Sequence, residues 1–211
     1  MHLAELPFRT LAIVRGTDRA AALRTVLTLA EEGITASEVS LTTTDAFWVI
    51  EHARRELGPD AVLGAGTVLT ADDAARAAAA GASFLVTPGL IDEPTPHVGS
   101  PGTELPVLMG ALTPSEILAA TRRAALGVAL FPAFVGGPAY LTALRDTFPY
   151  VPFVPVGGID APTAVAYLTA GAAAVGVGVP LVGDAADGGD QNELRARAAR
   201  WCSALSAAHT P

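Results

Sequence analysis

The chain has 211 residues, of which 51% are hydrophobic and 16% are charged, a size and composition that fit one compact unit with a substantial core. The net charge of −8 and the pI near 4.9 predict an acidic surface that repels phosphate backbones, so we expect no nucleic-acid partner. No apolar run reaches about 18 residues and residues 1–6 lack the pattern of a signal peptide, so we expect a cytoplasmic protein without a membrane partner.

Short apolar runs rich in β-branched residues alternate along the chain with Ala- and Leu-rich stretches at helical spacing. We predict strands at Thr10–Val14, Ser37–Thr42, Val62–Val68, Phe84–Pro88, Pro106–Gly110, Val128–Pro132, Phe153–Val156 and Ala174–Gly178. A helical pattern follows each strand, and the fourth, near Leu90–His97, is short and interrupted by proline. Eight such units in about 200 residues favour a parallel sheet closed into a (β/α)8 TIM barrel, with residues 1–211 as a single domain.

Several helices carry apolar stripes or start signals in the sequence. The stripes that we expect to face the core are Leu23, Val26, Leu27 and Ala30 in the first helix, and Leu194, Ala198, Trp201 and Leu205 in the last. Thr113 and Glu116 form a capping box around Pro114, and Asp160 can cap the helix after the seventh strand. Residues 183–190 are predicted to form a solvated loop.

In this fold the chemistry lies at the C-terminal ends of the strands. The polar residues predicted there are Arg15, Glu38, Ser40, Thr42, Thr67 and Thr87. Residues 38, 40 and 42 share one side of a strand by alternation. If Glu38 points into the barrel, burial raises its pKa towards neutral pH, which suits proton transfer. The alternative is a structural carboxylate that pairs with Arg15.

The other candidates each have a structural alternative. Arg15 can bind a substrate carboxylate through two hydrogen bonds, pair with Glu38, or lie on the surface. The Thr67 hydroxyl can bind substrate or a nearby backbone group. The N–H groups of Gly157 and Gly158 precede a helix and can receive an anion, although the glycines also suit a tight turn.

The sequence predicts no metal site and no cofactor. Its histidines, His2, His52, His97 and His209, lack ligand spacing, and the aspartates of residues 184–190 lack the calcium-loop pattern. The single cysteine, Cys202, lies in a helical pattern and is expected to pack.

The motifs at the strand ends resemble the 2-keto-3-deoxy-6-phosphogluconate / 4-hydroxy-2-oxoglutarate (KDPG/KHG) aldolase family. The resemblance covers nearly the whole chain through residues 12–16 (AIVRG), 38–42 (EVSLT), 64–68 (GAGTV), 87–89 (TPG), 130–133 (LFPA), 156–159 (VGGI) and 175–178 (VGVG). It implies a barrel aldolase that acts on a small 2-oxo acid and assembles as a homo-oligomer, commonly a trimer. It also implies that Glu38 is the general acid/base.

The same resemblance implies that a catalytic element is missing. The family's lysine on the sixth strand, which forms an imine with the 2-oxo acid, corresponds to Ala129, and all 13 Lys+Arg residues of this chain are arginines. Further departures are Phe134 for the usual Glu, Val156 for Thr, Val179 for a Ser that helps to hold phosphate, and Met109 for a common Pro. A single engineered change at Ala129 would not explain the others, which favours natural divergence.

These observations predict a carbon–carbon lyase, or a related enzyme of small 2-oxo acids or carbonyl compounds, that uses Glu38 without a lysine imine. One alternative is a barrel that lost its chemistry and binds an apolar or 2-oxo-acid ligand. A second is a metal-assisted aldolase or decarboxylase with Glu38 near the ion.

Overall fold

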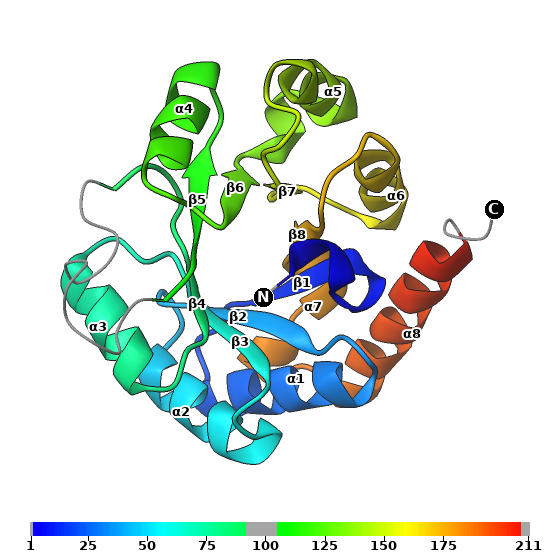
Figure 1. Cartoon of the computed structure of the whole chain (residues 1–211). Helices are drawn as coiled ribbons and strands as arrows, with labels where there is room; N and C mark the ends of the chain where they lie inside the picture. The colour runs from blue at the N-terminus through cyan, green and yellow to red at the C-terminus, as the bar shows by residue number, and fades with distance from the viewer. Residues whose placement is uncertain (1, 92–104, 208–211) are drawn as a thin grey trace.

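The computed structural model describes residues 2–91 and 105–207. Eight parallel strands pair in the order β7-β6-β5-β4-β3-β2-β1-β8, and a bridge between Val156 and Gly176 joins the two ends of the sheet into a barrel (Figure 1). The strands are β1 Thr10–Val14, β2 Ala36–Ser40, β3 Val62–Gly66, β4 Phe84–Val86, β5 Val107–Ala111, β6 Gly127–Leu130, β7 Phe153–Pro155 and β8 Val175–Val177. The predicted TIM-barrel fold is therefore confirmed.

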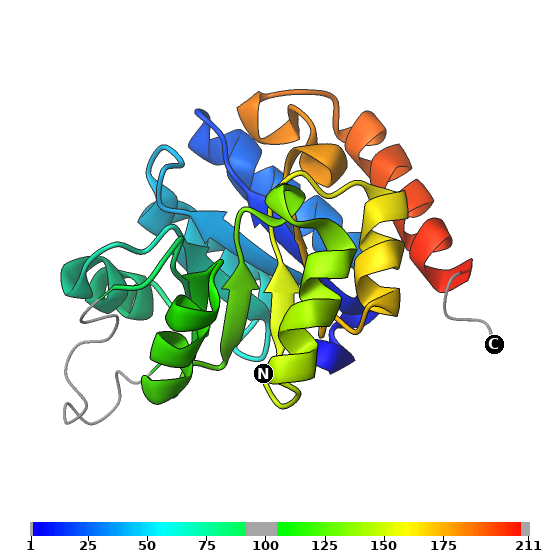
Figure 2. The same cartoon turned by 90° about the horizontal axis from the view of Figure 1, so that it is seen from above.

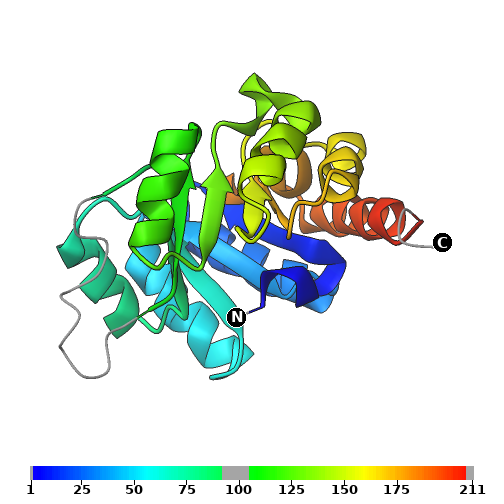
Figure 3. The same ribbon diagram turned by 45° about the horizontal axis from the view of Figure 1, so that its top comes forward.

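The helices form a ring outside the strands (Figures 1 and 3). They are α1 Arg19–Glu31, α2 Ala46–Leu57, α3 Ala71–Ala79, α4 Pro114–Arg122, α5 Gly137–Thr147, α6 Ala161–Thr169, α7 Val179–Val182 and α8 Gln191–Ala207. Short 3-10 helices lie at Leu3–Glu5 (η1), Pro7–Arg9 (η2), Ala133–Val135 (η3) and Ala185–Asp187 (η4). Among the described residues, no helix is long and apolar enough to cross a membrane.

Alternation along each strand divides the apolar residues between two cores. One set packs between the strands and the helices, and the other fills the barrel interior with residues such as Leu11, Phe84, Leu108 and Val154. Leu3 and Leu6 join the interior set, and the N-terminal segment lies over the centre of the strand ring (Figure 1). These side chains fill the N-terminal mouth of the barrel.

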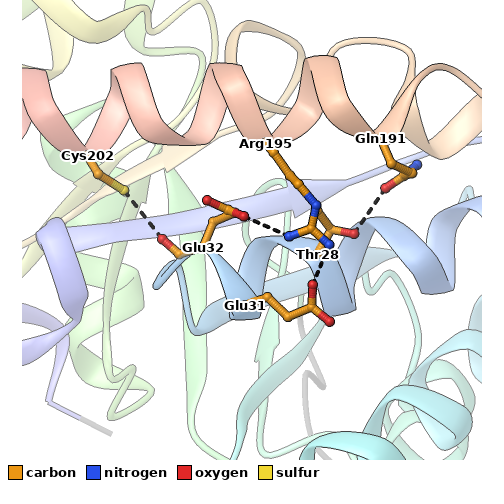
Figure 4. Close-up of polar contacts among 6 residues, drawn as sticks. All are labelled: Thr28, Glu31, Glu32, Gln191, Arg195 and Cys202. Atoms are coloured by element: carbon orange, nitrogen blue, oxygen red, sulfur yellow. Dashed lines mark hydrogen bonds and ion pairs between the residues drawn. The ribbon is translucent and has the colours of Figure 1, made fainter.

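Contacts between α1 and α8 fix the last unit against the first (Figures 2 and 4). The Arg195 guanidinium spans Glu31 and Glu32, at 2.7 Å from Glu32 Oε1, and Thr28 Oγ1 donates to Gln191 Oε1 at 3.1 Å. The buried Trp201 Nε1 donates to Thr10 Oγ1 at 3.0 Å, which ties α8 to β1.

The strands were predicted to within a few residues, but some were predicted too long. The second strand ends at Ser40 and the third at Gly66, so neither Thr42 nor Thr67 belongs to a strand. Thr67 has a left-handed backbone with φ of 59°, which no extended strand contains. The sixth strand ends at Leu130 rather than at Pro132.

The helix signals were mostly correct. The capping box at Thr113 and the Asp160 cap are confirmed, as is the buried face of α8. In α1 only Val26 of the predicted stripe is fully buried, and Ala22 and Leu29 are buried beside it. The buried face differs from the predicted stripe because α1 packs against η4 and α8 as well as against the sheet.

Two loop predictions need correction. Residues 183–190 are not a wholly solvated loop, because Ala185 and Ala186 are buried in η4 and Asp187 accepts hydrogen bonds from Thr17. Leu90 and Ile91 belong to no helix, and the rest of the Leu90–His97 segment lies outside the described residues.

Gly64 and Phe84 provide a test of the interior packing. A Cβ at Gly64 would lie 2.4 Å from Phe84 Cζ, inside a filled barrel where neither group can move freely. Gly64→Ala should therefore lower the free energy of unfolding by about 1–3 kcal/mol in urea denaturation. Gly89→Ala is the control, because no atom lies within 4 Å of its Cβ position. Equal midpoints for both variants would contradict this packing.

Candidate active site

A cavity of about 240 Å³ opens at the C-terminal end of the barrel. Its lining comes from six of the strands or the residues that follow them, and comprises Ile13, Arg15, Glu38, Thr67, Val86, Thr87, Pro88, Ala129, Phe131 and Val156. Most of these side chains are apolar, so the cavity surrounds one carboxyl group with a largely water-excluding wall. We call it the Glu38 cavity.

Glu38 is buried in the wall of this cavity, with only 4% of its surface exposed. Gly66 on the neighbouring strand makes room for it, since a Cβ at Gly66 would lie 2.5 Å from Glu38 Oε1. Glu38 Oε2 is buried and has no hydrogen-bond partner among the described residues. Burial raises the pKa of the Glu38 carboxyl from 4.5 to about 8, and the positive charge of Arg15 lowers it only in part.

Arg15 follows β1 and lies at the mouth of the Glu38 cavity, where its side chain is exposed. It acts on Glu38 through its charge, but within the described residues the two form no salt bridge within 4.0 Å. The predicted alternative of a direct Arg15–Glu38 ion pair is therefore wrong. The guanidinium keeps its donors available for a ligand.

The four hydroxyl candidates form two groups. Ser40 Oγ lies 2.8 Å from Thr42 Oγ1 and 2.9 Å from Thr67 Oγ1. Ser40 is fully buried and Thr42 is exposed, and of these three only Thr67 lines the Glu38 cavity. Thr87 also lines it, with Oγ1 donating to the Gly89 carbonyl at 2.7 Å and accepting from Gly110 N–H at 3.2 Å. Ser40 and Thr42 thus position Thr67 from outside the cavity.

A second and larger cavity of about 510 Å³ shares Ile13, Arg15, Phe131 and Val156 with the first. We call it the outer cavity. Its remaining lining is Gly157, Gly158, Ile159, Gly176, Gly178, Val179, Pro180, Val182 and Gly183. Both glycine candidates have positive φ, 103° at Gly157 and 70° at Gly158, a backbone region that favours glycine.

The positions at which the sequence departs from the resembled family fall in different places. Ala129 lines the Glu38 cavity, Val179 lines the outer cavity, and Val156 lines both. Phe134 lines neither cavity but lies on η3 against Gly158, whose Cβ position is 3.2 Å from Phe134 Cβ. Met109 lines neither cavity and belongs to the core between the strands and helices. Gly110, its neighbour on β5, pairs with Ala129 and therefore shares the interior side of the barrel.

Sequence reasoning missed Ile13 and Phe131, which line both cavities. A signal was present, because Ile13 lies two residues before Arg15 and Phe131 two residues after Ala129. Residues at this spacing point to the same side of an extended segment, here at the end of a strand.

The described residues contain no group of three or more His, Cys, Asp or Glu side chains that is placed to hold a metal ion. His52 lies on α2 and bonds the Trp48 carbonyl oxygen at 2.8 Å, and His2 precedes η1. Cys202 contacts the Glu32 carbonyl oxygen from α8. His97 and His209 lie outside the described residues.

Comparison with known proteins gives close relatives. A 2-dehydro-3-deoxy-phosphogluconate aldolase of Pseudomonas aeruginosa is 41% identical over 141 residues, which are 66% of this chain but only 63% of that protein. A probable 2-dehydro-3-deoxy-6-phosphogalactonate aldolase of Rhizobium meliloti is 33% identical over 200 residues, which are 94% of this chain and 92% of that protein.

Solved structures agree with the sequence matches. A structure described as native KDPGal superposes with a TM-score of 0.86 at 27% identity, over 97% of this chain and 96% of that chain. The KDPG aldolase of Legionella pneumophila, with pyruvate captured at low pH as a covalent carbinolamine, superposes with a TM-score of 0.81 at 28% identity, over 96% and 95%. The sequence also matches the family profile described as KDPG and KHG aldolase over residues 5–196. The chain therefore belongs to the KDPG and KHG aldolase family, a family of aldolase-type lyases.

Proposed function

We propose that this chain is a carbon–carbon lyase of small 2-oxo acids that works through Glu38 as general acid and base, without a lysine imine. The observation that carries the proposal is that the Glu38 carboxyl is buried without an ion-pair partner, in a cavity that Arg15 also lines. The chain has no lysine that could form an imine, because its 13 Lys+Arg residues are all arginines.

The ionisation of Glu38 suits both halves of a proton transfer. With a pKa of about 8, the carboxyl is mostly protonated at neutral pH and is still readily deprotonated. A catalytic group works best when its pKa lies near the working pH. A side chain of this kind can remove a proton in one step and return it in the next.

The absence of lysine separates this site from an imine mechanism. The Legionella relative holds pyruvate as a covalent carbinolamine, an adduct that requires an amine. Here Ala129, at the position that the resemblance assigns to the lysine, offers only a methyl group to the Glu38 cavity. The electrons of a cleaved bond must therefore go to the substrate's own 2-oxo group.

Arg15 is the group best placed to stabilise that charge. Its free guanidinium at the cavity mouth can bind the substrate carboxylate and lower the energy of the adjacent enolate oxygen. The Thr67 and Thr87 hydroxyls line the Glu38 cavity and would position the 2-oxo acid, and Ser40 and Thr42 hold Thr67 from behind.

The reaction then needs no co-reactant. In its deprotonated form Glu38 takes the proton of a 4-hydroxyl, the C3–C4 bond breaks, and C4 becomes an aldehyde carbonyl. The bonding electron pair forms the enolate of pyruvate, and the protonated Glu38 returns its proton to C3. We also propose, from the family resemblance, a cytoplasmic homo-oligomer, a trimer, that acts on small molecules.

Deuterium exchange into the methyl group of pyruvate tests Glu38 without knowledge of the full substrate. In D2O the parent should catalyse exchange, measured by NMR, because Glu38 moves the C3 proton. Glu38→Gln should lower the rate about 10²–10⁴-fold. Glu56→Gln makes the same change at an exposed carboxylate and should match the parent.

Equal exchange in the Glu38 variant and the parent would remove Glu38 from the mechanism. Exchange that a chelator abolishes and a divalent ion restores would instead indicate a metal-assisted enzyme.

The pH dependence of stability tests the ionisation itself. Between pH 4.5 and about 8 the folded chain keeps a proton on Glu38 that the unfolded chain releases, so the free energy of unfolding falls as pH rises. A glutamine side chain does not titrate in this pH range. Across this window the stability of Glu38→Gln relative to the parent should rise by up to about 5 kcal/mol, at 1.36 kcal/mol per pKa unit. Denaturation at pH 4.5, 6, 7.5 and 9 measures this change, and a difference that is constant with pH would contradict the raised pKa.

Borohydride trapping tests the absence of an imine. The parent incubated with pyruvate and borohydride should gain no adduct other than at its N-terminal amine. Ala129→Lys places an amine in the Glu38 cavity, where burial lowers its pKa and makes it nucleophilic, so a mapped adduct should form at residue 129. Glu56→Lys is the control for a surface amine. We expect weak turnover from Ala129→Lys, and an adduct elsewhere in the parent would overturn the proposed chemistry.

A further inference from the structure

The outer cavity adjoins the Glu38 cavity, with which it shares the lining residues Ile13, Arg15, Phe131 and Val156. A substrate whose 2-oxo group lies beside Glu38 must direct its remaining carbons either to solvent or into this space. The outer cavity, at about 510 Å³, is about twice the size of the Glu38 cavity at about 240 Å³ and is large enough for a substantial group.

The side chains around the outer cavity are apolar apart from Arg15. They are Ile13, Phe131, Val156, Ile159, Val179, Pro180 and Val182, and the other lining residues are glycines. No hydroxyl, amide or second charged side chain of the described residues lines the cavity. A charged group placed here would lose its water and gain few partners in return.

The glycines of this wall have a packing explanation. The Cβ position of Gly157 lies 3.4 Å from the Phe131 ring, and that of Gly158 lies 3.2 Å from Phe134 Cβ. Both also have positive φ. The positive φ of both residues, with the close approach of Phe134 at Gly158, therefore accounts for both glycines without an anion.

The charged side chains next to lining residues of the outer cavity already have partners. Arg197 lies against Gly183 and donates to the carbonyl oxygens of Leu181 and Val182. Asp160 caps α6, and its carboxylate accepts from Thr163 N–H at 2.9 Å. The hydrogen bonds from Thr163 hold the pKa of Asp160 below its usual value, so it stays negative at the helix start. Arg15 is the one cation of the lining, and it also borders the Glu38 cavity, where the substrate carboxylate needs it.

Apolar side chains are exposed at the rim of the outer cavity. Val179 is 76% exposed and Phe131 is 41% exposed, although both line the cavity. Apolar surface left open around a cavity is typical of a site that binds an apolar group.

From this lining we propose that the outer cavity binds an uncharged, apolar tail, so that the substrate is a 4-hydroxy-2-oxo acid with an aliphatic or aromatic group at C4. The inference rests on the proposed function for the reaction, which would release pyruvate and an apolar aldehyde by the C3–C4 cleavage given above. The tail site itself is defined by binding, which can be measured without turnover.

Calorimetry with unbranched 2-oxo acids from pyruvate to 2-oxooctanoate tests the tail site. Each buried methylene should tighten binding roughly threefold to fourfold until the cavity is filled. A 2-oxo acid of matched length that ends in a carboxylate or a phosphonate should bind at least tenfold more weakly than its apolar counterpart. Affinity that is flat with chain length, tighter binding of the charged tails, or no binding by any member would overturn the inference.

Variants locate the effect and separate it from catalysis. Val179→Ser should reduce the gain per methylene and leave the affinity for pyruvate unchanged, whereas Leu118→Ser, an exposed apolar residue on α4, should change neither. The oligomeric state of each variant is measured in parallel, so that a change in assembly is recognised. A chain-length effect without Glu38-dependent exchange would contradict the proposed reaction and leave the tail site standing. Glu38-dependent exchange without a chain-length effect would contradict the apolar tail site and leave the proposed reaction standing.

Discussion

The burial of the Glu38 carboxyl without a direct counter-charge is the constraint on which the site depends. A carboxylate in a barrel interior loses its hydration, and here no arginine comes close enough to replace it. The fold accommodates the group by leaving out a side chain at Gly66 and by letting the carboxyl keep its proton near neutral pH. The same burial that costs stability when the group ionises gives it a pKa suited to proton transfer.

The two ends of the barrel differ because of where the apolar side chains lie. Leu3, Leu6 and Leu11 join the interior core towards the N-terminal end, and Phe84 lies across the space that Gly64 leaves open. Smaller residues follow towards the C-terminal end, among them Ala129 and Gly110, which pair in register. This gradient in side-chain size leaves room beside Glu38 at the C-terminal end, so packing decides where the chemistry can occur.

Most of the fold could be predicted from the sequence, because alternation of strand and helix patterns reports burial directly. The cap at Asp160 and the inner face of α8 followed from local rules. Features that depend on the ends of strands could not be predicted, and the left-handed turn at Thr67 is the clearest example. Its backbone conformation places its hydroxyl against Ser40, a contact between two strand ends that no single-segment pattern contains.

The composition of the site was also only partly predictable. Glu38 and Arg15 are visible as charges in apolar sequence, but the distance between them depends on how far the Arg15 side chain turns towards solvent. The side on which Met109 lies depends on the strand register: its neighbour Gly110 pairs with Ala129 in the interior, so Met109 faces the helices. Cavities arise from several strands at once, so the outer cavity had no signal in the sequence beyond its separate valines and glycines.

A chain without lysine must hold the charge of a broken C–C bond in another way, and the protonation state of Glu38 bears on this. At neutral pH a mostly protonated Glu38 adds no negative charge to the cavity, so it does not repel an incoming carboxylate. A bound 2-oxo acid adds a negative charge nearby, which should raise the pKa of Glu38 further and lower the fraction of Glu38 that is deprotonated and can accept the 4-hydroxyl proton. The charge of Arg15 acts in the opposite direction on Glu38 and attracts the same substrate. The balance between these two charges, rather than a covalent adduct, would then set the pH at which Glu38 passes from acid to base.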